Sequence, residues 1–135
     1  MPEVDVVNEY VVSRWESGRP MCIDIAITKS GKAVMGIEVD GGQHFRENTG
    51  FRCDFDVIQR RDLLKEKTCV KVGLPMVRVI QEDVWDAKFD WKAFLIGLVN
   101  EAVGGNLVCK VHRQQSCLYS SGRYASLRVG TTVEV

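Results

Sequence analysis

The sequence lacks any apolar run of membrane-spanning length, and its acidic N-terminus lacks the basic and then apolar order of a secretory leader. Its five cysteines form no C-x-x-C pair and are odd in number, which favours reduced thiols over a disulfide framework. Internal repeats and low-complexity segments are also missing. These absences predict an intracellular globular protein that does not associate with a membrane.

Net charge is missing as well, because 18 basic and 18 acidic side chains cancel. The charges are nevertheless segregated: residues 44–71 sum to +2 and residues 105–135 to +3, and the other two segments are acidic. With 135 residues, 45% of them hydrophobic, the chain is long enough for one domain with a real core. The two basic segments are compatible with a nucleic-acid surface.

Hydrophobic periodicity predicts an α/β fold with a mixed sheet flanked by helices, in the order α-β-β-α-β-α. The first helix is expected because Val7, Tyr10, Val11 and Trp15 share one helical face after a capping Asp5. In chain order we expect a helix over residues 5–17, strands over 21–28 and 33–40, a helix from Asp54 to Lys71, a strand over 76–80, a helix over 90–103 and an edge strand over 107–111. Residues 1–112 would form the core domain. Residues 113–135 would form a basic, loosely ordered tail with a strand over 127–135.

The most informative motif runs from Gly36 to Phe45 and reads G-I-E-V-D-G-G-Q-H-F. Side chains alternate along a strand, so Glu38 and Asp40 point to the same face. Two neighbouring carboxylates repel each other, and beside glycines and His44 they are typical of a metal-binding, acid–base site. The alternative is a solvent-facing strand edge that ends in a glycine turn.

Asp24 is the only charged residue in the otherwise largely apolar stretch from Met21 to Thr28. A buried, unpaired carboxylate is costly, and a metal or a nearby cation would remove that cost. A hairpin with its turn at residues 30–32 would bring Asp24 towards Glu38. Mg²⁺ prefers such carboxylate oxygens. The alternative is an exposed strand end where Asp24 is only solvated.

Together these motifs resemble a known group of nucleases. The Asp24 strand, the I-E-V-D-G-G-Q-H-F motif, the Q-R-R-D-L-L-K stretch over residues 59–65 and the V-R-V-I stretch over 77–80 are similar to the very-short-patch-repair endonucleases. They are also similar to phage homing endonucleases and other small members of the PD-(D/E)xK restriction-endonuclease-like superfamily. The resemblance covers about residues 5–85, and it implies a restriction-endonuclease-like fold.

The resemblance also implies roles for individual residues. Asp24 matches a metal-binding Asp, Glu38 the acid of the (D/E)xK element, and Asp40 the position where many members carry Lys. His44 matches a histidine that assists activation of water, and Asp62 matches the R-D element of the following helix. The implied metal ligands are Asp24, Glu38 and Asp40, and the implied cofactor is Mg²⁺ or Mn²⁺.

The lysine two residues after Glu38 is missing, so His44, Gln43 or Lys65 would have to replace it. Metal-assisted phosphodiester hydrolysis would follow, with His44 taking a proton near neutral pH. The side chains expected to bind nucleic acid are Gln43, Arg60, Arg61, Lys65, Arg113 and Arg123. For the helix residues, a solvated face paired with neighbouring acids is an equal alternative, and the basic tail could simply be solubilising.

The sequence therefore predicts a metal-dependent endonuclease, an enzyme that hydrolyses DNA in repair or homing. The chief alternative is a non-catalytic RNA- or DNA-binding module, because the RAP domain has a similar I-E-x-D-G-x-x-H-F signature. Asp24 and the R-D-x-x-K element favour the nuclease. A third alternative is an assembly or inhibitory protein whose site has decayed. Phosphate contacts do not read bases, so a homodimer or a partner protein is the expected source of specificity.

Overall fold

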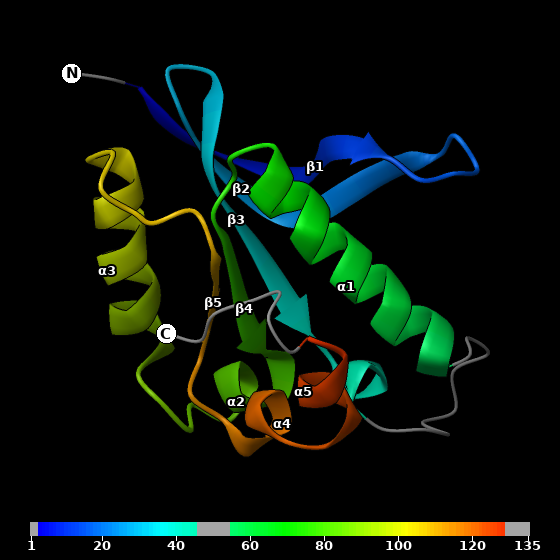
Figure 1. Cartoon of the computed structure of the whole chain (residues 1–135). Helices are drawn as coiled ribbons and strands as arrows, with labels where there is room; N and C mark the ends of the chain where they lie inside the picture. The colour runs from blue at the N-terminus through cyan, green and yellow to red at the C-terminus, as the bar shows by residue number, and fades with distance from the viewer. Residues whose placement is uncertain (1–2, 46–54, 129–135) are drawn as a thin grey trace.

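Five strands form one open, mixed sheet in this α/β protein, whose computed structural model describes residues 3–45 and 55–128. The strands lie side by side in chain order: β1 (Val4–Arg14), β2 (Pro20–Lys29), β3 (Lys32–Asp40), β4 (Met76–Ile80) and β5 (Val111–Arg113). The strand β2 runs antiparallel to both of its neighbours, β1 and β3, and β3, β4 and β5 run parallel. Figure 1 shows the long β3 and the shorter β4 at the centre of the molecule.

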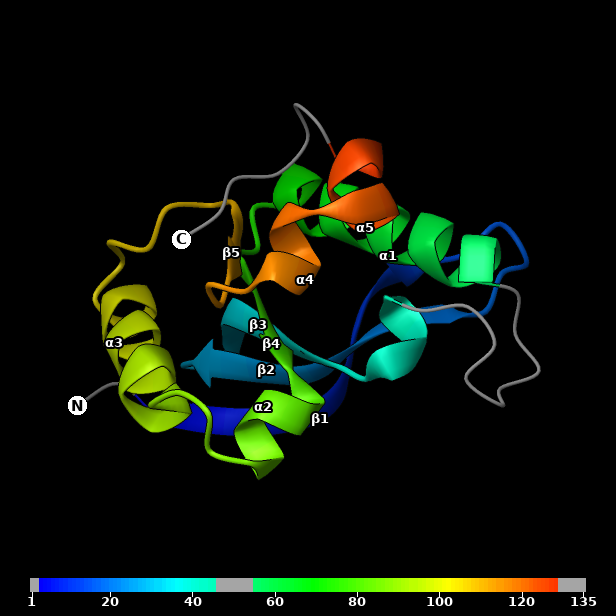
Figure 2. The same cartoon turned by 90° about the horizontal axis from the view of Figure 1, so that it is seen from below.

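Helices cover both faces of the sheet and its lower end. They are the 3-10 helix η1 (Gly42–His44), α1 (Phe55–Lys71), α2 (Gln81–Trp85), α3 (Trp91–Val103), α4 (Cys117–Ser120) and α5 (Gly122–Leu127). The helix α1 connects the parallel strands β3 and β4, as such a crossover requires. Seen from below, α1 and α3 lie on opposite sides of the sheet, and α4 and α5 lie close to α1 (Figure 2).

The elements around the Gly36–Phe45 motif form as predicted. The turn between β2 and β3 places Ser30 at φ 51° and Gly31 at φ 80°, the left-handed pair that a two-residue hairpin needs. The predicted helix over 54–71 and strand over 76–80 correspond to α1 and β4. Asp90 caps α3, because its Oδ1 accepts a hydrogen bond from the Ala93 amide at 3.1 Å. The predicted cap Asp54 lies outside the described residues.

The predicted N-terminal helix is wrong, because this segment is the edge strand β1. Five of its eleven residues are valine, which packs well on a pleated sheet and is stiff in a helix. Pairing with β2 from Val4 to Arg14 satisfies its backbone along one side, with an irregularity between Val11 and Ser13. The helical spacing of the large apolar residues was therefore a coincidence of a valine-rich run.

The C-terminal part of the described chain also differs from the prediction. The fifth strand is β5, Val111–Arg113, and not the stretch over residues 107–111. Beyond it, α4 and α5 bury Tyr119, Tyr124 and Arg128, so residues 113–128 are not a loose tail. Most of the strand predicted over residues 127–135 lies outside the described residues, and Leu127 itself ends α5.

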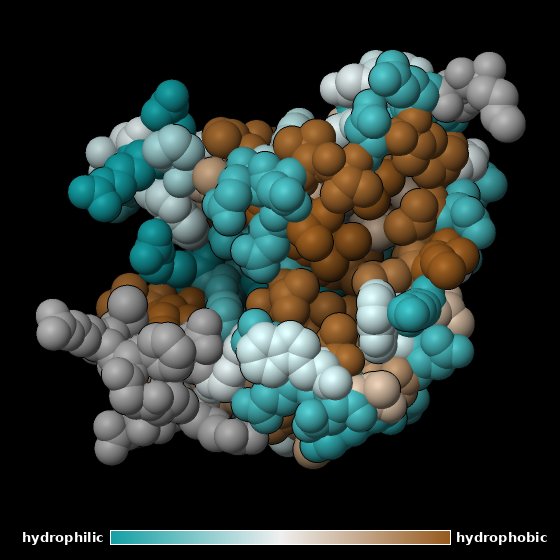
Figure 3. All heavy atoms as spheres, turned by 180° about the vertical axis from the view of Figure 1, so that it is seen from behind, coloured by the Kyte–Doolittle hydropathy of each residue, from teal (hydrophilic) through white to brown (hydrophobic). Residues whose placement is uncertain are grey.

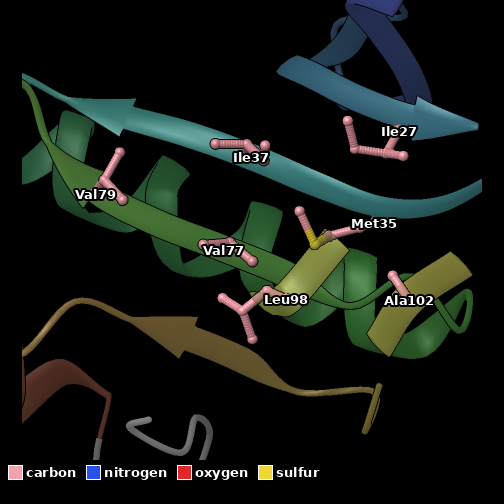
Figure 4. Packing of buried hydrophobic residues seen from close by; sticks show 7 residues of the cluster. All are labelled: Ile27, Met35, Ile37, Val77, Val79, Leu98 and Ala102. Atoms are coloured by element: carbon pink, nitrogen blue, oxygen red, sulfur yellow. The ribbon is translucent and has the colours of Figure 1, made fainter. Parts of the chain in front are cut away.

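The hydrophobic core is divided between the two faces of the sheet. Val77 and Val79 of β4 point towards α3, where they pack with Ile37, Leu98 and Ala102 (Figure 4). Met76, Arg78 and Ile80 alternate to the opposite face, which carries α1. Apolar side chains also gather across the rear of the molecule (Figure 3). The edge strand β1 leaves Val6 66% exposed. The face towards α1 holds most of the buried charge.

No helix in residues 3–45 and 55–128 has both the length and the apolar composition that crossing a membrane requires.

Candidate active site

Charged residues from β3, β4 and α1 meet on the sheet face beneath α1. Glu38 of β3 stands directly beside Arg78 of β4 in the parallel register, and Asp40 follows two residues later on the same face. Asp62 and Glu66 of α1 are buried one turn apart above them. Burying acids is unfavourable unless cations and hydrogen bonds compensate, so their partners define what the site can do.

Glu38 is paired with a lysine from the helix. Lys65 Nζ donates a hydrogen bond to Glu38 Oε1 at 2.9 Å, and the Glu38 side chain is 6% exposed. Burial raises the pKa of Glu38 to about 7, although Lys65 and Arg78 both oppose this shift. Glu38 therefore titrates near neutral pH, next to a cation that originates 27 residues further along the chain.

Asp24 lies on the strand next to Glu38. Ile25 pairs with Ile37 in the antiparallel register, so Asp24 and Glu38 are each one residue from the same strand pair. Asp24 Oδ2 accepts a hydrogen bond from the Val39 amide at 3.0 Å, which ties the carboxylate to β3. Its negative charge contributes to the raised pKa of Glu38. The predicted convergence of these two acids is confirmed.

Asp40 accepts hydrogen bonds from one cationic side chain and one hydroxyl group. Its Oδ1 accepts a hydrogen bond from Arg78 Nη1 at 2.6 Å, and its Oδ2 accepts one from the Tyr119 hydroxyl at 2.8 Å. Neither Asp40 nor Arg78 is exposed to solvent. The Arg78 Nε also donates to Glu66 Oε1 at 2.9 Å. Both carboxylate oxygens of Asp40 are thus occupied by groups of the protein itself.

His44 forms a dyad with Asp62. The 3-10 helix that follows β3 brings His44 to α1, where its Nδ1 shares a short hydrogen bond with Asp62 Oδ2. Gln59 Nε2 donates to the His44 carbonyl at 3.0 Å and holds the backbone there. No hydrogen bond engages His44 Nε2 among the residues that the structure describes. A proton can therefore be accepted at Nε2 while Nδ1 remains bound to Asp62.

Electrostatics favour the charged form of this dyad. Burial alone lowers the pKa of His44, but the hydrogen bond that its Nδ1 donates to Asp62 and the charges of Asp40 and Asp62 raise this pKa above its usual value. For Asp62, burial acts to raise the pKa, while Arg78 and the bond to His44 outweigh burial and lower it. The carboxylate thus stays ionised and stabilises an imidazolium.

The C-terminal helices complete the buried network. Arg128 Nε donates to Glu66 Oε2 at 2.9 Å, and its guanidinium lies 3.6 Å from the ring centroid of Tyr124. Sequence reasoning missed Glu66, Tyr119, Tyr124 and Arg128 as parts of this site. A signal for Glu66 was present, because Gln59, Asp62 and Glu66 recur at helical spacing on the face that α1 buries. No such signal marked the C-terminal residues.

The predicted nucleic-acid contacts fall in different surroundings. Arg60 and Arg61 are exposed on α1, whereas Lys65 points inward to Glu38. Arg113 is buried, with its Nη2 3.4 Å from Glu66 Oε1, so the predicted contact between Arg113 and nucleic acid does not fit this position. The side chains of Gln43 and Arg123 lie outside the part of the chain that the structure describes.

Residues 3–45 and 55–128 contain no group of three or more His, Cys, Asp or Glu side chains that is arranged to hold a metal ion. The chain matches no protein-family model, no curated protein and no solved structure.

Proposed function

We propose that the protein is a metal-dependent endonuclease of the restriction-endonuclease-like type that hydrolyses phosphodiester bonds of DNA. The observation that carries this proposal is the contact between Lys65 and Glu38, with Asp24 on the adjacent strand. Two acids and a lysine on neighbouring elements form a compact group that can bind a cation and a phosphate together. The order of β2, β3, α1 and β4, with β3 and β4 parallel, supports the proposed type of fold.

Asp24 and Glu38 are the residues that would hold Mg²⁺ or Mn²⁺. Such ions bind proteins through one or two carboxylates and take further oxygens from water and substrate phosphates, so this pair fits. Burial raises the pKa of Glu38 to about 7, and a carboxylate in that state gains from a nearby cation. Asp40 does not fit, because both of its oxygens are engaged by Arg78 and Tyr119. A metal ion held by Asp24 and Glu38 would polarise the phosphate and lower the pKa of a bound water molecule.

The chain's own residues supply the remaining chemistry. Lys65, next to Glu38, would stabilise the negative charge that develops on the phosphate. His44 would accept the proton of the attacking water at Nε2, with Asp62 holding the ring through Nδ1. Asp40 would act indirectly, because its Oδ1 lies 3.8 Å from His44 Nδ1 and it anchors Arg78 beneath the dyad.

Plasmid cleavage tests the proposal. Supercoiled DNA incubated with the protein and Mg²⁺ or Mn²⁺ is expected to become nicked or linear, and a chelator is expected to prevent this. Asp24→Asn and Glu38→Gln should each abolish cleavage. Glu101→Gln, an exposed acid on α3, is the matched control and should leave cleavage unchanged. Intact plasmid with every metal, combined with measurable oligonucleotide binding, would instead support the non-catalytic binding module.

A further inference from the structure

A groove lies between the β1–β2 hairpin and α1, on the side of the helix away from α3. Both ribbon views place the hairpin beside α1 (Figures 1 and 2). The groove has a volume of about 600 Å³, within the size range of pockets that bind small organic ligands. Its lining includes the apolar side chains of Met21, Val57 and Leu64. No residue of the proposed catalytic group lines it, so it is a separate feature of the surface.

An aromatic ring and a cation stand together at this groove. The Arg61 guanidinium lies 4.6 Å from the ring centroid of Trp15, within the range of a cation–π contact. The backbone that carries Trp15 is fixed by its turn, because the Trp15 amide donates to the Arg19 carbonyl at 2.9 Å and the Trp15 carbonyl accepts from the Gly18 amide at 2.8 Å. The turn therefore presents the indole ring from an ordered backbone, which lowers the entropic cost of binding.

The charge of the groove favours an anionic ligand. Arg14 and Arg61 line it, together with a single acid, Glu16. Two further exposed arginines flank these residues in the chain, Arg19 in the hairpin turn and Arg60 on α1. Arg14 also closes the turn by donating to the Gly18 carbonyl at 2.7 Å, so its charge is held at this position.

The groove and the proposed site share two elements, α1 and β2. Leu64 of the groove immediately precedes Lys65 on α1, and Met21 lies three residues before Asp24 on β2. A chain of phosphates that crosses Lys65 and Glu38 would therefore reach the groove within a short distance along the helix. Apolar lining residues, an indole ring beside an arginine and further flanking arginines suit one ligand class in particular: a base attached to a phosphate backbone.

We propose that the groove around Trp15 and Arg61 binds an unpaired nucleotide of a single DNA strand, next to the phosphate cleaved at Glu38 and Lys65. The base would stack on the Trp15–Arg61 pair, and the arginines would contact its phosphates. Paired bases keep their faces inside the duplex stack, so an intact duplex cannot offer one to Trp15. The preference for an unpaired strand near the cut rests on the proposed nuclease function.

Binding without catalysis tests the groove directly. Fluorescence anisotropy of a short labelled single strand, in chelator, is compared with that of a duplex of the same sequence. We expect the protein to prefer the single strand, and Trp15→Ala to weaken binding roughly 5- to 150-fold, the effect of losing one stacked base. Trp15→Tyr should retain most of the affinity, which separates stacking from a folding defect. Trp85→Ala, an exposed tryptophan on α2, is the matched control.

The salt dependence of single-strand affinity distinguishes the phosphate contact of Arg61 from the base stacking of Trp15. Arg61→Ala is expected to reduce the slope of log affinity against log salt by about 0.7, the value for one phosphate contact on a single strand, while Trp15→Tyr leaves the slope unchanged. Lys92→Ala is the control, because Lys92 lies 5.5 Å from the ring centroid of Trp91 in a comparable pair on α3. An unchanged slope for Arg61→Ala would contradict a phosphate contact there.

Two results distinguish this inference from the proposed function. Equal affinity of wild type and Trp15→Ala for the single strand, with plasmid still cleaved in a Glu38-dependent manner, overturns the groove and leaves the nuclease intact. Binding of the single strand that depends on Trp15, without cleavage under any metal, supports the groove as a nucleotide site and overturns the nuclease.

Discussion

Lys65 Nζ lies 2.9 Å from Glu38 Oε1, and the two residues come from a helix and a strand that are separated by a loop. The residue two positions after Glu38 is Asp40 and not a lysine. The helix α1 instead delivers a lysine to the Glu38 carboxylate from a different element.

Removing this lysine should affect catalysis far more than folding. Lys65→Met is expected to reduce single-turnover plasmid cleavage by roughly 100- to 1,000-fold, the usual effect of losing one donor to a developing anion. Lys67→Met, exposed on the same helix, is the control and should cleave normally. Equal rates for the two variants would remove Lys65 from the mechanism.

Glu38 should cost the protein stability above neutral pH. Its folded-state pKa of about 7 exceeds the ordinary glutamate pKa of 4.5, so the folded state binds more protons between these pH values and its stability falls as pH rises through this window. Glu38→Gln should therefore increase the free energy of unfolding at pH 8, by roughly 3 kcal/mol as an upper bound. Urea denaturation of both proteins at pH 4 and pH 8 measures this. A decrease at pH 8 would contradict the sign.

The pH dependence of cleavage should report the dyad. His44 accepts a proton only when neutral, and because its pKa is raised, cleavage should increase with pH at values above the ordinary histidine range. Asp62→Asn removes the charge that raises this pKa, so the increase should move to lower pH while the maximal rate falls. His44→Ala should lack the transition entirely. A profile that does not move in Asp62→Asn would separate Asp62 from His44.

Arg78 should be essential for folding. Arg78→Met would leave the Asp40 and Glu66 carboxylates buried without their central cation, and breaking such a network typically costs about 3–5 kcal/mol. Urea denaturation, compared with the exposed Arg60→Met, measures the loss; the control should change stability by no more than about 0.5 kcal/mol. A stable Arg78→Met protein would mean that these acids are protonated in the fold.

The hydroxyl group of Tyr119 should contribute to the stability of the fold separately from its ring. Tyr119→Phe keeps the ring contacts with Phe45 and Tyr124 but leaves Asp40 Oδ2 without its donor, so we expect a loss of roughly 1–3 kcal/mol. Tyr10→Phe on β1, whose hydroxyl lies outside this network, is the control for thermal denaturation. Equal melting temperatures for the two variants would show that the hydrogen bond is not needed.

The sequence predicted the parts of the fold that local patterns determine. The strands that carry Asp24 and Glu38, their tight turn, the helix over residues 55–71 and the strand with Arg78 all follow from composition, turn chemistry and periodicity. The placement of Asp24 and Glu38 at the same end of the hairpin also followed from the sequence. These residues are close in sequence, or their elements have a strong periodic signal.

The missed features depend on contacts between distant residues. The spacing of the apolar residues near the N-terminus predicts a helix where the structure has the strand β1, because pairing with β2 and a high valine content outweigh that spacing. Arg128 contacts Glu66 from 62 residues away, and Tyr119 contacts Asp40 from 79 residues away. The short, polar sequences of α4 and α5 do not indicate these contacts. Asp40 lies two residues from Glu38 in the same motif, but it is bound by Arg78 and Tyr119 and not by Lys65. Neighbouring acids of one motif therefore need not share a role.

The sheet follows the chain in strict order, so the proposed chemistry is assembled from one uninterrupted stretch between Asp24 and Arg78. Everything before it and after it contributes support or surface. The two ends of the chain are therefore free to diverge, to be exchanged or to be fused to other modules, provided that a tyrosine and an arginine still close the network from outside. A change of target could evolve at the ends without rebuilding the centre.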